Sequence, residues 1–451
     1  MGSGRVWWWR TVLGLGVPLL SLGLVAGVSL AAGGAGVAEA ASVSGVGHVT
    51  IFAGLSDPAG ITAGPDGNLW FTNPGNSTIG RVTPAGQVRV FTGRGIDGPE
   101  EITAGPDGAL WFTNYGNKSI GRITTTGTVT TYTGKGINEP AEITAGPDGN
   151  LWFTNNDRDS IGRITTTGTV TIYHRAAIDG PEGITAGPDG TLWFTNHFGD
   201  AIGRITTTGT LTTHHGRVID GPDGITAGPD GALWFTNAEG NSIGRITTTG
   251  KVTTYTGAGI DAPTGITAGP DGALWFTNGT DSIGRITTTG TVTTYTGTGI
   301  RRPYGITAGP DGALWFTNNY GNSIGQITTS GTVTIYRRAG IDGPQGITAG
   351  PDGALWFTNY LGESIGRIST AVTPAIGSVT PASGAAGTTV TITGQNLADA
   401  TAVAFGGTPA TIVSATTTQI VTTVPAGAAT GHITVTTPAG TATSHHKFTV
   451  T

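Results

Sequence analysis

The ten residues GPDGALWFTN, from Gly105 to Asn114, recur seven more times along the chain with at most one letter changed. Their tryptophans follow one another at intervals of 41 residues, with a single interval of 40. A period of this length is typical of the β-propeller blade, at about 40–45 residues, and of the helical HEAT repeat, at about 40–47. The residues around the motif decide between the two. The repeated tryptophans are Trp70, Trp111, Trp152, Trp193, Trp234, Trp275, Trp315 and Trp356.

Each repeat contains four short runs rich in apolar residues or threonine, of the form GITAG, ALWFTN, SIGRITT and TVTTYT. Gly, Pro, Asp or Asn bounds each run and none has helical periodicity, so we expect strands joined by turns. The turns have suitable residues, as in Pro106-Asp107-Gly108 and Thr125-Thr126-Gly127, because glycine readily adopts the positive φ that they need. Four strands in each repeat predict a propeller blade.

The ends of the repeat region predict how the ring closes. The first three strands occur in eight copies, but no fourth strand follows the last copy. The segment His48–Phe52 has the pattern of the missing strand. We therefore predict an all-β chain with an eight-bladed β-propeller over residues 47–370, closed by its N-terminal strand so that no sheet edge stays open. A seven-bladed ring with one displaced repeat is the alternative, because eight is at the upper end of the common range.

The residues of the motif itself are interpreted as structural. The tryptophans stand in the middle of a predicted strand, where a large aromatic side chain fills the space between neighbouring sheets. Asp107 and its equivalents are interpreted as turn residues rather than as metal ligands.

Variation among the repeats is confined to two segments, the connection from the second strand to the third and the connection between blades. In an up-and-down blade both emerge on the same face of the disc, opposite the invariant turns. Loops on a rigid scaffold usually carry function, so this variable face is the predicted binding face. The residues expected on it are Glu100, Glu101, Glu142, Glu182, Asp223, Thr264, Arg301, Arg302, Tyr304 and Gln345.

Three histidines, His174, His197 and His215, stand in or beside the loops of the third and fourth repeats. Near Glu182 and Asp223 they could supply a base or a metal ligand. They lie in separate loops without the spacing of a ligand set, so no metal site is predicted.

The N-terminus has the features of an export signal. Arg5 and Arg10 precede an uncharged apolar stretch, and Ala38-Glu39-Ala40 offers small residues at a cleavage site. We predict a signal peptide over residues 1–40 and a secreted or cell-surface protein. An uncleaved anchor is the alternative, because the apolar stretch approaches the length of a membrane span.

Composition restricts the partners of the mature chain. The net charge of the full sequence is -6, no basic run is present, and there is no cysteine. The predicted partners therefore exclude nucleic acid and, after signal cleavage, the membrane. Disulfides are excluded, and we expect a monomer.

The repeats end at the predicted linker, residues 371–373, after which the sequence changes character. Residues 374–451 alternate short strands and turns, which predicts a small β-sandwich. The opening TPASGAAGTTVTITG and the turn FGGTPA closely resemble the IPT/TIG immunoglobulin-like domain. The resemblance implies a spacer or interaction module, and no catalytic group is evident in it.

The P-x-G-I-T, LWFT and SIGRIT motifs of residues 47–370 resemble the virginiamycin B lyase, or streptogramin lyase, family. The resemblance implies a propeller, seven-bladed in the family, and an elimination that linearises streptogramin B antibiotics with magnesium and a histidine base. It places Tyr304 and Gln345 at the positions of two family histidines, and Gly343 at that of a glutamate. None of these three side chains can act as the family's base or metal ligand.

The sequence therefore favours a secreted propeller that binds a small molecule, a glycan or a protein on its variable face, without a cofactor. One alternative is a lyase that opens a cyclic ester with magnesium and with relocated groups, namely His197, His215 and Glu182. Another alternative is a structural or adhesive surface protein.

Overall fold

The computed structural model describes residues 46–370, 374–397, 400–416, 418–437 and 440–451. The predicted signal peptide and the predicted linker lie outside these residues. Regular structure in the described ranges is β-strand, apart from two 3-10 turns at Pro74–Asn76 and Asn156–Arg158. Within the same ranges, no helix has the length and apolar character that a membrane span requires.

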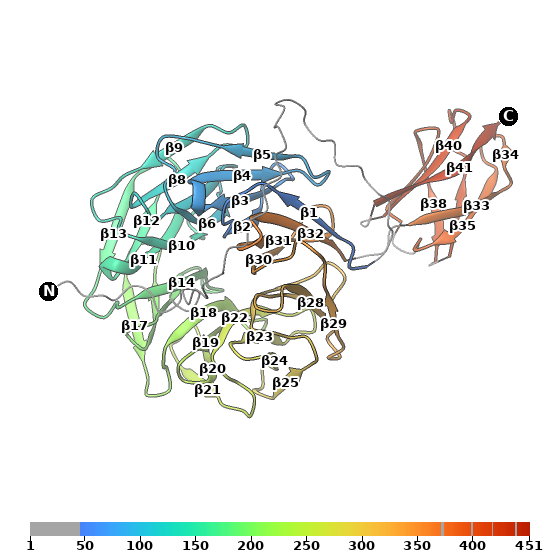
Figure 1. The fold of residues 1–451 in the computed structure, drawn as a ribbon. Helices are drawn as coiled ribbons and strands as arrows, with labels where there is room; N and C mark the ends of the chain where they lie inside the picture. The colour runs from blue at the N-terminus through green and yellow to red at the C-terminus, as the bar shows by residue number, and fades with distance from the viewer. Residues whose placement is uncertain (1–45, 371–373, 398–399, 417, 438–439) are drawn as a thin grey trace, which may run out of the picture. The chain divides into compact units, whose positions relative to one another are not determined.

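Residues 49–369 form eight four-stranded antiparallel sheets, one for each sequence repeat, and the sheets follow one another around a ring (Figure 1). The inner strands are β2 (Ile61–Ala63), β6 (Pro99–Ala104), β10 (Pro140–Ala145), β14 (Pro181–Ala186), β18 (Pro222–Ala227), β22 (Pro263–Ala268), β26 (Pro303–Ala308) and β30 (Pro344–Ala349). The second strands are β3 (Leu69–Asn73), β7 (Leu110–Asn114), β11 (Leu151–Asn155), β15 (Leu192–Asn196), β19 (Leu233–Asn237), β23 (Leu274–Asn278), β27 (Leu314–Asn318) and β31 (Ala354–Asn359).

The third strands are β4 (Thr78–Val82), β8 (Ser119–Ile123), β12 (Ser160–Ile164), β16 (Ala201–Ile205), β20 (Ser242–Ile246), β24 (Ser282–Ile286), β28 (Ser323–Ile327) and β32 (Ser364–Ser369). The outer strands are β5 (Val88–Phe91), β9 (Val129–Tyr132), β13 (Val170–His174), β17 (Leu211–His215), β21 (Val252–Tyr255), β25 (Val292–Thr296), β29 (Val333–Tyr336) and β1 (Val49–Ala53). We number the blades from one, which begins with β2, to eight, which begins with β30.

The ring closes through its inner strands and through the N-terminal strand. Each inner strand contacts the next, from β2 to β30, and β30 contacts β2 again. Strand β1 pairs antiparallel with β32, from Val49 opposite Ile368 to Ala53 opposite Ser364. The predicted closure by the N-terminal strand is confirmed, and the sheet of blade eight therefore joins residues from both ends of the propeller.

A polar and aromatic arrangement repeated in each blade explains the invariant motif. In blade two the Trp111 indole donates a hydrogen bond to Asp107 Oδ1 at 3.0 Å, and Arg122 Nε donates to Asp107 Oδ2 at 2.7 Å. Tyr132 stacks on Trp111, with ring centroids 5.4 Å apart. Trp111 is fully buried. The structural interpretation of the tryptophans and of Asp107 is confirmed, because the aspartate is already occupied by the indole and the guanidinium.

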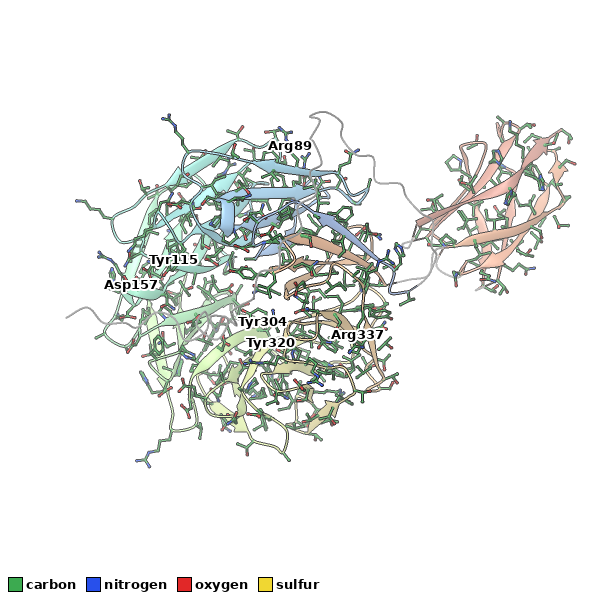
Figure 2. The ribbon with its side chains drawn as sticks, in the orientation of Figure 1. Arg89, Tyr115, Asp157, Tyr304, Tyr320 and Arg337 are labelled. Atoms are coloured by element: carbon green, nitrogen blue, oxygen red, sulfur yellow. The ribbon has the colours of Figure 1, made fainter. Side chains whose placement is uncertain are left out.

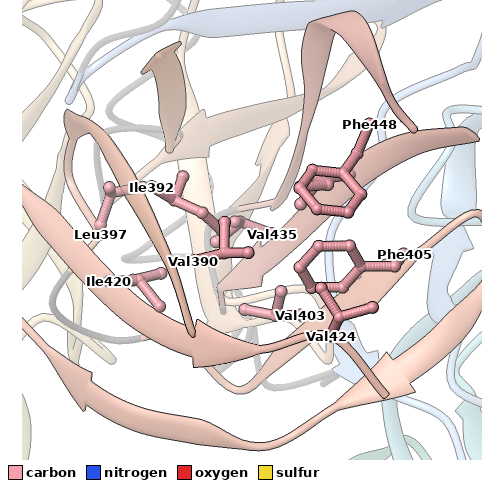
Figure 3. Close-up of a cluster of buried hydrophobic side chains, with 10 residues drawn as sticks. Val390, Ile392, Leu397, Val403, Phe405, Ile420, Val424, Val435 and Phe448 are labelled. Carbon is pink, nitrogen blue, oxygen red and sulfur yellow. The ribbon is translucent and has the colours of Figure 1, made fainter. Parts of the chain in front are cut away.

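Residues 374–451 form two further sheets. One has the order β33 (Ala375–Thr380), β35 (Thr389–Gln395), β39 (Gln419–Thr423), β38 (Ile412–Ala415). The other has the order β34 (Ser383–Gly384), β41 (Gly440–Val450), β40 (Gly431–Thr437), β36 (Ala402–Phe405), β37 (Thr408–Ala410). Side chains from both sheets, including Val390, Ile420 and Val435, meet in one apolar core (Figure 3). Phe405 and Phe448 meet edge to face at 5.0 Å in this core.

Candidate functional site

A threonine in each second strand fixes the backbone at the start of the inner strands. In blade two Thr113 Oγ1 accepts a hydrogen bond from the Glu101 amide at 3.0 Å and donates one to the Ala141 carbonyl of blade three at 2.9 Å. The same donation to the next blade is made by Thr72, Thr195, Thr236, Thr277 and Thr317. In six blades these bonds hold the carbonyl of the residue after the inner-strand proline, a position expected on the variable face, in a fixed place.

The next residue along each inner strand is crowded by the neighbouring blade. Six of the eight blades have glycine there. A Cβ at one of these glycines, Gly224, would lie 2.6 Å from the Thr264 carbonyl oxygen of the next blade. Blades two and three have Glu101 and Glu142 at this position instead. These two carboxyls therefore depart from the repeat at a place where the fold favours the smallest residue.

Carboxyl groups from blades two to five act on one another. Burial raises the pKa of Glu182 to about 8, with Asp223 and Glu142 adding to the rise. Burial, and then Asp223, raises the pKa of Glu142 to about 7. Burial, with Glu142 and Glu100, raises the pKa of Glu101 well above its ordinary value. We call Glu101, Glu142, Glu182 and Asp223 the acidic cluster; its members come from four successive inner strands.

Tyr304 faces this cluster from blade seven. The surrounding protein raises the pKa of its phenol by desolvation, and all four carboxylates of the acidic cluster raise it further. The blades surround Tyr304, yet 51% of the residue is exposed to solvent. Figure 2 shows Tyr304 toward the middle of the ring in that view, near Tyr320. Tyr304 is therefore partly open to solvent and lies within electrostatic reach of the four carboxyls.

Residues that directly follow the LWFTN motif interact with two members of the acidic cluster. Asn156 Nδ2 donates a hydrogen bond to Glu182 Oε1 at 3.1 Å. His197 is only 7% exposed, and burial raises the pKa of Asp223 while the electrostatic contribution of His197 lowers it. His197 Nε2 lies 3.7 Å from Glu239 Oε1 of the next blade. Our sequence analysis missed Asn156 and Glu239, although their fixed distance from the motif was a usable signal.

The other residues expected on the variable face have different surroundings. Thr264 is 8% exposed, and its hydroxyl lies 3.0 Å from that of Thr277. It therefore belongs to the backbone support and presents little surface to a ligand. Arg301 lies 3.7 Å from Asp281, and the Arg302 guanidinium lies 4.6 Å from the centre of the Tyr320 ring.

The structure does not bring the three relocated lyase candidates together. Glu182 lies on an inner strand and His197 beside the acidic cluster, but His215 ends β17, the outer strand of the same blade. His215 is exposed there and pairs in register with Ala201. His174 likewise ends an outer strand, β13, and is exposed.

The resemblance places Gly343, Tyr304 and Gln345 at the positions of the family's catalytic set. Gly343 has a φ of +56°, and a Cβ there would lie 2.7 Å from Leu361 Cγ. A glutamate at 343 would therefore require Leu361 to move. Tyr304 and Gln345 offer a phenol and an amide, neither of which is a base at neutral pH. These residues do not fit a magnesium ion with a histidine base, and no set of three His, Asp or Glu side chains in the described ranges is placed to hold a metal.

The geometry defines a β-propeller in which four successive inner strands bear the acidic cluster. Comparison with known families then gives a more specific class. The model of the virginiamycin B lyase family matches residues 45–258 and 179–374, and the IPT/TIG domain model matches residues 374–451. The chain belongs to the virginiamycin B lyase family and carries a C-terminal IPT/TIG domain.

Solved structures agree with this assignment. A streptogramin B lyase structure is 32% identical, covers 71% of this chain and 97% of its own, and superposes with a TM-score of 0.53. A catalytically inactive histidine-to-alanine variant of virginiamycin B lyase from Staphylococcus aureus, with quinupristin, is 36% identical. That match covers 60% of this chain and 94% of its own, with a TM-score of 0.53. Among the curated proteins, none matches the chain.

Proposed function

We propose that this protein is a binding member of the virginiamycin B lyase family, whose acidic cluster takes a ligand with ammonium or other cationic groups. The observation that carries the proposal is a set of four carboxyls on successive inner strands. Burial raises the pKa of each, and neighbouring carboxyls raise it further for Glu101, Glu142 and Glu182. A cation placed among them replaces repulsion between carboxylates with attraction. Tyr304 adds an aromatic face, to which cations are also attracted.

The ionisation of the cluster couples binding to pH. Glu142 and Glu182, with pKa values of about 7 and about 8, hold protons at neutral pH. A cationic ligand favours the ionised carboxylates, so its binding releases protons. The affinity for the cation is therefore expected to rise with pH between about 6 and 8.5, as protons compete less for the site.

The alternative function of this protein is the elimination reaction of the family. The inactive relative has lost one histidine to alanine, and this chain has Tyr304 and Gln345 where the resemblance places family histidines. Gly343, in its left-handed conformation against Leu361, supplies no carboxylate. These features favour binding without the family's turnover.

Binding of 1,4-diaminobutane, with neutral 1,4-butanediol as the matched probe, tests the proposal. We expect the diamine to bind the full chain at pH 8 and the diol not to bind. The double variant Glu142→Gln/Glu182→Gln should lose the binding. The control Glu363→Gln removes one carboxylate from an exposed position between β31 and β32 and should keep it. Equal affinity of the double variant and the control for the diamine would refute the proposal.

We also propose that the protein is exported, as its first 40 residues predict, and that the IPT/TIG domain acts as a spacer or second contact. Amino-terminal sequencing of the protein recovered outside its cells tests the first point. A mature end at Ala41 supports cleavage, and an intact Met1 contradicts it.

A further inference from the structure

One blade departs from the aromatic stacking that all the others share. In blade four His214 stacks on Trp193, with ring centroids 5.7 Å apart and planes inclined by 17°. In the other seven blades the stacking partner of the tryptophan is a phenylalanine or a tyrosine that does not gain a proton. These partners are Phe52, Phe91, Tyr132, Tyr173, Tyr255, Tyr295 and Tyr336.

His214 lies where blade four meets blade five. A Cβ built at Gly250, in the turn between β20 and β21, would lie 2.3 Å from His214 Cε1. The tyrosines of other blades fill the same space, since Gly168 and Gly290 approach Tyr132 and Tyr255 equally closely. The imidazole is thus packed against the backbone of the neighbouring blade.

The charged groups around His214 do not favour a second cation. The Arg204 guanidinium lies 5.7 Å from the centre of the Trp193 ring, and Asp189 is already paired with Arg204 at 2.9 Å. His215 follows on the same strand, and Lys251 follows Gly250 in the facing turn. Burial, then Arg204 and His215, lowers the pKa of His214. The folded blade therefore holds the imidazole neutral.

We propose that His214 is an acid-sensitive contact, through which proton uptake loosens the interface between blades four and five. When the interface between blades four and five is closed, the packed His214 ring faces Arg204 and Trp193. Mild acid therefore protonates the ring more readily when this interface is open. The stabilisation from a neutral His214 is complete above the ordinary histidine pKa, about 6.5, and is lost as the pH falls toward the lower folded value.

Native-state amide hydrogen exchange of the full chain, at pH 7.5 and pH 5, tests this contact. The matched variant is His214→Tyr, which restores the residue of the other blades. After correction for the intrinsic pH dependence of exchange, we expect severalfold less protection at pH 5 in β17 and in the turn at Gly250 of the wild-type protein. His214→Tyr should show no such loss, and the corresponding strands of blade two should be unaffected in both proteins.

A gain-of-function variant and a titration complete the test. Tyr132→His should transfer the acid-dependent loss of protection to the interface of blades two and three. The imidazole signal that disappears in His214→Tyr should titrate below the ordinary histidine range. Equal protection of wild-type and His214→Tyr proteins at pH 5, or titration of that signal at or above the ordinary range, would overturn the proposal.

Discussion

Substituting Glu182 by glutamine should stabilise the propeller at alkaline pH much more than in mild acid. Glutamine has the shape of protonated glutamate and can still accept the hydrogen bond from Asn156 Nδ2, which is 3.1 Å long in the wild type. The substitution therefore removes the ionisation of the side chain and little else. Any change in the pH dependence of stability then reports on that ionisation.

The direction of this change in stability follows from the proton that Glu182 keeps in the folded state. The pKa of Glu182 rises from 4.5 to about 8 in the folded protein, so the folded state keeps a proton that the unfolded state has released. The associated stability is complete below about pH 4.5 and is lost as the pH rises through 8. Over the whole range the loss is about 4–5 kcal/mol, at roughly 1.4 kcal/mol for each unit of pKa, as an upper limit.

Urea unfolding at pH 5.5 and pH 8.5 measures the effect. We expect Glu182→Gln to be more stable than the wild type by about 2–4 kcal/mol at pH 8.5 and by a much smaller amount at pH 5.5. The control Glu363→Gln, at an exposed position, should follow the wild type at both pH values. A parallel pH dependence of wild type and Glu182→Gln would refute the argument that Glu182 holds a proton at neutral pH.

Three further outcomes are expected. Deletion of residues 42–53 removes buried Val49 and the stacking of Phe52 on Trp356 at 5.6 Å. The free energy of unfolding should fall by about 3–6 kcal/mol. An unchanged melting temperature would contradict the ring closure. Thr113→Val leaves the Glu101 amide and the Ala141 carbonyl without their hydrogen-bond partner. The free energy of unfolding should therefore fall by about 2–4 kcal/mol, and a fall below about 0.5 kcal/mol would show that these bonds are dispensable. A streptogramin B antibiotic incubated with the protein and magnesium should remain cyclic, as measured by chromatography, because losing a general base lowers the rate by a factor of about 100–10,000. Turnover equal to that of an authentic lyase would contradict the assignment of this protein as a binding member of the family.

The repeat made most of the fold predictable from the sequence. The 41-residue interval, the four short runs and the missing last strand together indicated a propeller closed by its N-terminal strand. Strand β1 pairs with β32 as that reasoning required. Physically, seven of the eight blades satisfy their own backbone within a local meander, so short-range patterns carry most of the information that the topology needs.

For a binding site, the sequence predicted only the face of the propeller and not the interactions between its side chains. Glu101, Glu142 and Glu182 were expected there, but which of them act on one another depends on side-chain directions across blades. Thr264 was expected to meet a ligand, whereas its hydroxyl instead lies 3.0 Å from that of Thr277. Asn156 reaches Glu182 of the following blade, a contact that no pattern within one repeat contains.

Calorimetric titration of the protein with 1,4-diaminobutane at pH 7.5, in two buffers of different ionisation enthalpy, tests the central claim most directly. The difference between the two heats gives the number of protons exchanged on binding. Cation binding to a site where Glu142 and Glu182 titrate near neutrality should release protons, and Glu142→Gln/Glu182→Gln should abolish both the binding and the release. Diamine binding without proton release, or release that persists in the double variant, would contradict the assignment of the acidic cluster as the binding site.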